Sequence, residues 1–169
     1  MYTVAILEHR RRLSAFLSEA LPEHIKNTID LCPGGSLPRG EIADLLVIAP
    51  DFQKDDPPDI ACGALLVPGY LSRLAGKVKT NQVVSYGISP KNSLTLSSLG
   101  EREICLAIQR ELITLSGDCL PCQELLLPHG GCTAPYHLLA CAGIQLLLDV
   151  PPQKITAAGS HNRPSPADR

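Results

Sequence analysis

The sequence lacks an excess of basic residues. Its 15 Lys and Arg residues are outnumbered by 17 Asp and Glu residues, which gives a formal net charge of −2. Proteins that bind nucleic acids in general present a basic surface that displaces counterions from the phosphates. The composition therefore predicts no nucleic-acid partner, and it gives no support for docking on an acidic membrane.

Long apolar runs are also missing. The apolar segment at residues 1–7 is followed directly by the charged residue Glu8. It therefore lacks the basic segment and the long apolar segment of a signal peptide. The longest apolar stretch, residues 138–148, is interrupted by Gln145 and is shorter than the roughly 20 residues that span a bilayer. The chain has seven cysteines, an odd number that favours reduced thiols over a disulfide framework. We therefore expect a cytoplasmic protein with no membrane partner.

The residues that are present suit one globular domain. Apolar residues make up 44% of the 169 residues and charged residues 19%, values typical of a folded chain that can bury a core. After residue 150, proline, glycine and serine replace most of the apolar residues that a core requires. We expect a single α/β domain over residues 1–150 and a flexible tail over residues 151–169.

The N-terminal half contains continuous apolar runs that indicate buried strands. These runs cover residues 2–7, 28–31, 43–49 and 62–67. Leu13, Leu17 and Leu21 recur at helical spacing until Pro22, and residues 70–75 suit a second short helix. Unbroken strands of this kind predict a mainly parallel, Rossmann-like sheet with helices packed against it.

The C-terminal half has the pattern of antiparallel hairpins followed by a helix. Strands over residues 82–88 and 93–99 flank a turn at residues 89–92. Residues 103–114 fit a helix or a strand, and we favour a strand because the turn at residues 116–118 then leads into residues 120–127. Thr133 as N-cap and Pro135 in the first turn predict a helix that ends at residue 148.

Several segments resemble the end of the central domain of the Mur ligases. The family's order of a helix, a "vvtYG" strand and a β-rich excursion is matched by residues 71–75, 83–88 and 93–96. Residues 129–142 resemble the family's "GxHNxxNxLAAxA" entry to a helix, and residues 55–57 match its "DDP". The ATP-cradling G-x-x-x-x-G-K-[ST] loop is absent, as are the asparagines of "HNxxN". The resemblance implies a reduced relative without ligase activity, so we carry over no catalytic residue.

Four possible metal ligands occur close together: Cys119, Cys122, His129 and Cys132. A Cys-x-x-Cys pair can clamp one zinc ion, and the following His-x-x-Cys could complete a tetrahedral set. The gap between the two pairs is shorter than the usual finger spacing, and the strand predicted over residues 120–127 would separate them. Zinc, an iron–sulfur cluster, a redox-active thiol pair and simple packing cysteines therefore remain alternatives.

The candidate anion-binding residues lie in two segments: His9, Arg10 and Arg11, and Gly130, Gly131 and Thr133. The first segment joins the first strand to the first helix, where ligands of α/β sheets bind. Arginines at a helix N-terminus oppose the helix dipole unless an anion or a carboxylate compensates. The second segment precedes the last helix, whose free N–H groups can bind an anion. The alternatives are a solvated basic turn and an ordinary capped helix start.

No Ser/His/Asp order and no pair of acidic residues in the sequence points to catalysis. We therefore expect a non-catalytic module that binds a protein partner or a small anionic ligand. The alternative is a metal-binding or thiol-redox protein that uses the cysteine and histidine set described above.

Overall fold

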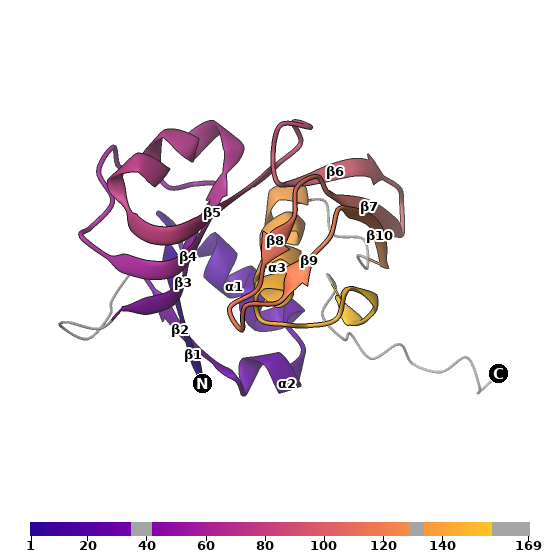
Figure 1. The fold of residues 1–169 in the computed structure, drawn as a ribbon, viewed down its shortest axis with the longest axis horizontal. Coiled ribbons are helices and arrows are strands. Elements are labelled where there is room, and N and C mark those ends of the chain that lie inside the picture. Colours follow the sequence, from indigo (N-terminus) through magenta and orange to yellow (C-terminus); the bar gives the residue numbers. More distant parts are fainter. Residues whose placement is uncertain (35–41, 129–133, 157–169) are drawn as a thin grey trace.

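Strands are the most frequent elements in the part of the chain that the structure, a computed structural model, describes: residues 1–34, 42–128 and 134–156. Their bounds are β1 Tyr2–Leu7, β2 Ile29–Pro33, β3 Ala43–Ile48, β4 Ala61–Pro68, β5 Lys79–Gly87, β6 Leu94–Leu99, β7 Glu103–Ile108, β8 Leu112–Ile113, β9 Cys119–Leu120 and β10 Gln123–Pro128. Eight of them form one sheet in the order β10-β7-β6-β5-β4-β3-β1-β2, while β8 and β9 form a separate hairpin (Figure 1).

The helices cover both faces of the parallel part of this sheet. They are α1 Arg12–Ala20, α2 Glu23–Lys26, α3 Pro135–Leu147, and the 3-10 helices η1 Gly69–Lys77 and η2 Pro152–Lys154. Apolar residues of α1 and α3 pack on one face, and Leu74 of η1 packs on the other. Among the helices of the described ranges, none is long and apolar enough to cross a membrane.

The central part of the sheet is parallel, as the apolar runs predict. Strands β2, β1, β3, β4 and β5 all pair in parallel with their neighbours. From β1 the chain passes through α1 and α2 to β2, and it then returns to β3 on the opposite side of β1. The strand order thus reverses between β1 and β3, and in open α/β sheets ligands bind beyond the carboxyl ends of the strands at such a reversal.

Alternate residues of the parallel strands pack into two different cores, which is why these strands are apolar on both faces. Val4 and Ile6 of β1 lie in the core that contains α1 and α3. Ala5 and Leu7 lie in the core that contains Leu74 of η1.

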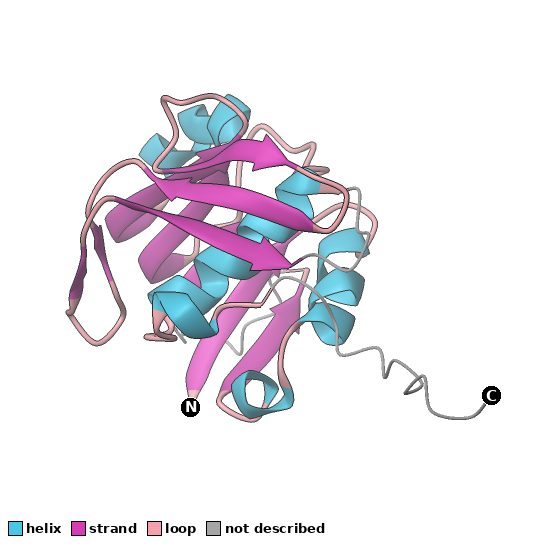
Figure 2. Cartoon of the chain, turned by 90° about the vertical axis from the view of Figure 1, so that its right-hand side faces the viewer, coloured by secondary structure: helices cyan, strands magenta, loops and turns pink. Residues whose placement is uncertain are grey.

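The sheet divides between β5 and β6. These two strands pair in parallel over two positions only, Tyr86 opposite Leu94 and Gly87 opposite Thr95. Beyond them, β6, β7 and β10 pair antiparallel, which confirms the predicted antiparallel structure in this half of the chain. The strands on either side of residues 89–92 were predicted as part of these hairpins, but they pair in parallel. Viewed from the side of these three strands, α3 lies behind them (Figure 2). The helix contacts β4, β5 and β6, and therefore fills the angle between the two parts of the sheet.

Close packing fixes α3 in this angle. All side chains from Leu138 to Leu147 are buried, so this helix is apolar on every side. A Cβ atom at Gly143 would lie 2.9 Å from Cδ1 of Leu94 in β6 and 3.1 Å from Cδ2 of Leu66 in β4. Glycine at this position therefore allows one helix to contact both parts of the sheet.

The structure corrects several sequence-based boundaries. The N-cap of α3 is Ala134 rather than Thr133, because the helix begins at Pro135, whose ring suits the first helical position; Thr133 lies outside the described residues. The strand predicted over residues 120–127 is divided into β9 and β10 around Pro121, which has no N–H to donate to a ladder. Residues 103–108 form a strand, as favoured. The single turn of α2 was not predicted.

The first residues of the predicted tail pack against α3. Ile155 is 4% exposed and belongs to the larger core. Gln145 of α3 is fully buried; its Nε2 donates to the carbonyl of Thr156 at 2.6 Å, and its Oε1 accepts the Thr156 N–H at 3.3 Å. The one polar residue of the long apolar stretch thus connects the helix to the segment that follows it.

Replacing Gln145 tests this connection. The Gln145→Leu variant keeps the side-chain volume but leaves the N–H and C=O groups of Thr156 without their partner, so we expect the free energy of unfolding to fall by about 1–3 kcal/mol. Chemical denaturation measures this change. The matched control is Gln153→Leu at an exposed position, expected to stay within about 0.5 kcal/mol of the wild type. Equal effects of the two substitutions would contradict this role of Gln145.

Candidate functional site

The junction between β1 and α1 is occupied by the protein's own carboxylates. The backbone N–H groups of His9 and Arg10 donate to the Asp51 carboxylate at 3.3 and 3.0 Å. Glu8 accepts the N–H of Ser14, in the first turn of α1, at 3.1 Å. Arg11 adopts a left-handed conformation with φ of 53°. A carboxylate therefore compensates the positive junction, which is one of the two possibilities that the sequence leaves open.

His137 lies next to this junction. Its ring centroid is 5.5 Å from that of Phe16 in α1. Partial burial lowers the pKa of His137 below its usual 6.5; Asp51 and Glu8 oppose this shift, while Arg12 reinforces it. The first turn of α3 is thus close to the ends of β1 and β3. In the described part of the chain, Oε1 of Glu8 is buried without a hydrogen-bond partner.

A cavity of about 510 Å³ opens beside the carboxyl ends of β4 and β5; we call it the edge cavity. It is lined by Gly69, Tyr70, Ser72, Ser85, Ser89, Lys91, Asn92, Arg110 and Tyr136. These residues come from the start of η1, the end of β5, the β5–β6 loop, the segment after β7 and the first turn of α3. Segments from both halves of the chain therefore meet in one place, beside the carboxyl ends of parallel strands but two strands away from the reversal between β1 and β3.

The β5–β6 loop is a rigid turn that presents Lys91. The N–H of Lys91 donates to the Ser89 hydroxyl at 3.4 Å. The backbone N–H and the side-chain amide of Asn92 both donate to the Ser89 carbonyl, at 3.1 and 3.0 Å. Asn92 is 6% exposed, and a Cβ atom on Gly69 would collide with its amide group. Glycine at position 69 is needed for this close approach.

Side chains replace backbone pairing where β5 and β6 separate. The hydroxyl of Ser85 accepts the Ser93 N–H at 3.0 Å, and the hydroxyl of Ser93 accepts the Ser85 N–H at 3.4 Å. Gln82 bonds both the N–H and the C=O of Ile113, and so attaches the β8–β9 hairpin to β5. The chain thereby satisfies polar groups that the short pairing would leave exposed.

Three tyrosines form one wall beside the edge cavity. The ring of Tyr136 makes edge-type contacts with Tyr70, at a centroid distance of 5.5 Å, and with Tyr86 at 6.2 Å. The hydroxyl of Tyr70 donates to the Pro50 carbonyl and that of Tyr86 to the Ile48 carbonyl, both at 2.7 Å. Burial raises the pKa of both phenols, and Tyr86 rises far above its usual value. Both hydroxyls therefore stay protonated at neutral pH and act as donors.

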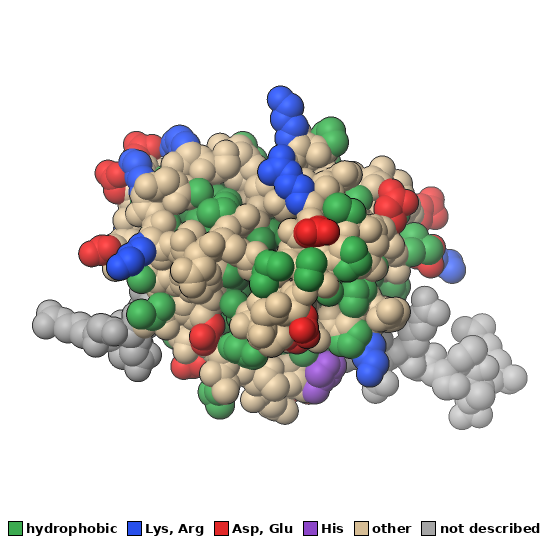
Figure 3. Space-filling model, viewed as in Figure 1, with side chains coloured by type: hydrophobic (Ala, Val, Ile, Leu, Met, Phe, Trp, Pro, Cys, Tyr) green, Lys and Arg blue, Asp and Glu red, His purple; other side chains and the backbone are tan. Residues whose placement is uncertain are grey.

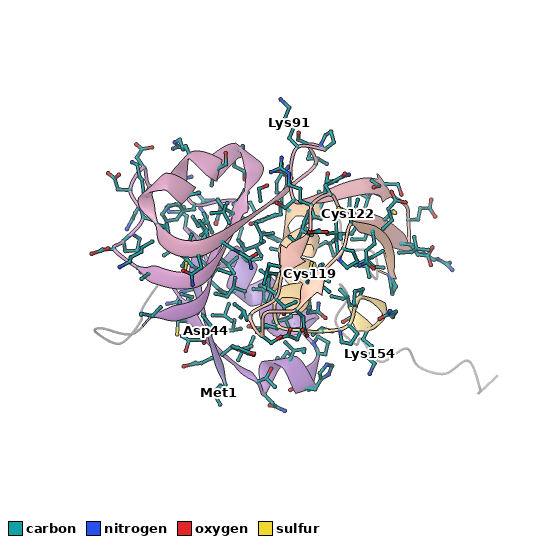
Figure 4. The ribbon with its side chains drawn as sticks, in the orientation of Figure 1. Met1, Asp44, Lys91, Cys119, Cys122 and Lys154 are labelled. Atoms are coloured by element: carbon teal, nitrogen blue, oxygen red, sulfur yellow. The ribbon has the colours of Figure 1, made fainter. Side chains whose placement is uncertain are left out.

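The charged residues that line the edge cavity are cations. Lys91 and Arg110 are exposed, and they take part in none of the ion pairs found in the described ranges, which involve Lys26, Arg73 and Lys77. Figure 4 places Lys91 at the top of the molecule, and Figure 3 shows basic side chains grouped there in the same orientation. Two cations without a carboxylate partner produce a local positive potential on a chain whose net charge is −2.

The polar side chains that line the edge cavity are hydroxyl, amide and cationic groups. The described residues that line the cavity include no carboxylate, imidazole or thiol group. The Ser85 hydroxyl is already used to bond Ser93.

No family model, no curated protein and no solved structure gives a significant match to this chain.

The structure describes only some of the residues that the sequence analysis selected. Cys119 and Cys122 are both exposed, on β9 and in the turn before β10 (Figure 4). His129, Gly130, Gly131, Cys132 and Thr133 lie outside the described residues. Within the described ranges, no group of three or more His, Cys, Asp or Glu side chains could hold a metal ion. The proposed four-residue metal set therefore stays a prediction.

The sequence analysis missed the residues of the edge cavity. Its one local signal is the turn at residues 89–92, which directly follows a predicted buried strand and carries a lysine. Arg110 and Tyr136 have no local signal, because they reach the cavity only through the pairing of β6 with β7 and the position of α3.

A second hollow of about 500 Å³ runs along the outer edge of β10. It lies between this strand and residues 152–156. Its charged residues are Glu124 and Lys154, one of each sign, so it presents no net charge to a ligand. It also lies away from the carboxyl ends of the parallel strands. The edge cavity is therefore the better candidate site.

The lowered pKa of His137 predicts a pH dependence of stability. Because the folded protein binds a proton at this ring less readily than the unfolded chain does, protonation favours unfolding. Above pH 6.5 we expect His137 to cause no loss in the free energy of unfolding. As the pH falls from 6.5 toward the lower pKa of the folded state, the free energy of unfolding should decrease progressively. Chemical denaturation between pH 5 and 8 should show a smaller loss in His137→Gln, whereas His24→Gln, at an exposed position on α2, should behave as wild type.

The metal hypothesis makes its own prediction. Protein purified without chelator should hold about one zinc ion or one iron–sulfur cluster per chain. Elemental analysis should show that the double variant Cys119→Ser, Cys122→Ser loses the metal, while Cys105→Ser on β7 retains it. Metal-free wild-type protein, or metal retained by the double variant, would exclude these cysteines as ligands.

Proposed function

We propose that this protein is a non-catalytic α/β module that binds a small anionic ligand in the edge cavity. One observation carries the proposal: two cations, Lys91 and Arg110, line a cavity of about 510 Å³ that has no acidic lining residue among the described ones. The neighbouring residue Glu111 is exposed and does not line the cavity. An anion can therefore approach both cations without meeting a negative charge in the cavity wall.

The chemistry of the lining supports an acidic group as the part of the ligand that is recognised. A guanidinium and an ammonium group form charge-assisted hydrogen bonds to phosphate or carboxylate oxygens, and these are about twice as strong as neutral ones. The hydroxyls of Ser72 and Ser89 lie in the same lining and can donate further hydrogen bonds. A phosphate or carboxylate thus finds donors of two kinds in one cavity.

The framework of the cavity supports a preformed site. The turn that carries Lys91 is held by three hydrogen bonds to Ser89, and Asn92 is enclosed beside Gly69. The Tyr70 ring is held through its hydroxyl to Pro50. Little loop ordering has to accompany binding, and this lowers the entropic cost of association.

The proposal extends to a relationship with the Mur ligases, as a reduced, Rossmann-like relative without ligase activity. The order of η1, then β5 ending in Tyr86 and Gly87, then antiparallel strands, then α3 supports it. The β1–α1 junction supports the loss of ligase chemistry, because it is only four residues long and because Asp51 and Glu8 accept hydrogen bonds from the N–H groups of the junction and of the first turn of α1. An ATP-dependent ligation or hydrolysis activity of the purified protein would overturn this part of the proposal.

Charge reversal tests anion binding. The double variant Lys91→Glu, Arg110→Glu should bind inorganic phosphate at least about tenfold more weakly, because each charge-assisted contact contributes about 1.5–3 kcal/mol. Titration followed by NMR at low ionic strength measures the dissociation constant and, through the shifted amides, the location of binding.

The control changes the net charge by the same amount elsewhere. Lys79→Glu, Lys154→Glu alters two exposed lysines that do not line the edge cavity, and it should bind phosphate as the wild type does. Equal weakening in both double variants would show that phosphate senses only the overall charge, and no binding by the wild type would overturn the proposed function.

A further inference from the structure

We infer that the ligand of the edge cavity carries a planar ring next to its acidic group, so that it is an aromatic phosphate or an aromatic carboxylate. This inference rests on the proposed function, since it describes the rest of a ligand whose acidic group contacts Lys91 and Arg110. The feature that points to a ring is the wall made by Tyr70 and Tyr136.

Tyr70 combines exposure with a fixed position. It is 56% exposed, although it lines a concave site. Its hydroxyl donates to the Pro50 carbonyl at 2.7 Å, and its ring meets that of Tyr136 at an interplanar angle of 73°. A single exposed aromatic residue on a convex surface is ordinary. A ring that is held at its hydroxyl and at its edge, and still faces a cavity, is prepared to contact a ligand.

The rings behind Tyr70 make the wall rigid. Tyr136 also contacts Tyr86, at an interplanar angle of 61°, and Tyr86 is fully buried with its hydroxyl bonded to Ile48. The exposed tyrosine is thus connected through two ring contacts to the core strand β3. A rigid aromatic surface favours a flat partner, because offset stacking needs two planar faces.

The size and polarity of the cavity agree with a two-part ligand. Its volume of about 510 Å³ is in the range of pockets for complete small molecules, and inorganic phosphate alone would leave most of it empty. The cations come from the loops that follow β5 and β7, whereas the aromatic rings come from η1 and α3. An acidic group and a ring on the same molecule can therefore bind different lining elements at once.

The test compares ligands that share an acidic group and differ in the attached group. Dissociation constants are measured by NMR titration for inorganic phosphate, cyclohexyl phosphate, phenyl phosphate and benzoate. We expect phenyl phosphate to bind about 5- to 100-fold more tightly than inorganic phosphate, the range that stacking of one aromatic ring supplies. Cyclohexyl phosphate, of similar size but not planar, should gain less. Comparing benzoate with phenyl phosphate tells which of the two acidic groups the site prefers.

Variants of the tyrosines and of the cations separate the contributions that each group makes to ligand affinity. Tyr70→Leu should reduce the affinity for phenyl phosphate toward that for inorganic phosphate, so that the variant binds the two ligands about equally. Tyr70→Phe keeps the ring and should retain most of the preference, while Tyr136→Leu, with its fold checked by circular dichroism, should lose it. The double variant Lys91→Glu, Arg110→Glu should weaken both ligands together.

The outcomes distinguish this inference from the proposed function. Tighter binding of phenyl phosphate that depends on Tyr70 supports both. Equal affinities for phenyl, cyclohexyl and inorganic phosphate, all dependent on Lys91 and Arg110, would overturn the inference that the ligand carries an aromatic ring. They would leave the proposed anion binding in place. Absence of any binding would overturn both.

Discussion

The position of α3 in the angle of the sheet is the constraint on which the rest of the structure depends. This helix has no solvent-facing side over Leu138–Leu147, so both parts of the sheet have to cover it. A flat eight-stranded sheet could not do this, and the sheet accordingly divides where β5 and β6 pair over only two positions. The reciprocal bonds of Ser85 and Ser93 and the bonds of Gln82 to Ile113 satisfy the backbone groups that this division exposes.

The same division creates the candidate site. Because β6 begins beside the carboxyl end of β5, the loop between the two strands lies at this edge of the sheet. This loop carries Lys91. The start of α3 lies at this end as well, and it brings Tyr136 against Tyr70 and Tyr86. At the other obvious position, the junction of β1 and α1, the carboxylates of Asp51 and Glu8 already bond the N–H groups that an anion would use. The fold thus leaves one open cationic site at this edge and closes another with its own acidic residues.

Sequence reasoning succeeded where one segment alone carries the information. The runs that form β1, β3 and β4 are apolar because both of their faces are buried. The amino-acid composition of each run is therefore enough to predict a buried strand. It was less successful where a short pattern permits two structures: the strand predicted over residues 120–127 became two strands with different partners, β9 on β8 and β10 on β7. Partner choice depends on the register of distant strands, and no local pattern reports it.

The sequence by itself determined the fold class, the change from parallel to antiparallel strands and the start of the last helix near Pro135, because hydrophobic periodicity and turn residues act over a few neighbouring positions. It also indicated that an anion or a carboxylate could compensate the basic β1–α1 junction, although not that Asp51, more than 40 positions away, does so. Only the tertiary structure decided that Tyr70, Lys91, Arg110 and Tyr136 line one cavity. These residues are far apart along the chain, and packing of α3 between the two parts of the sheet is what brings them together.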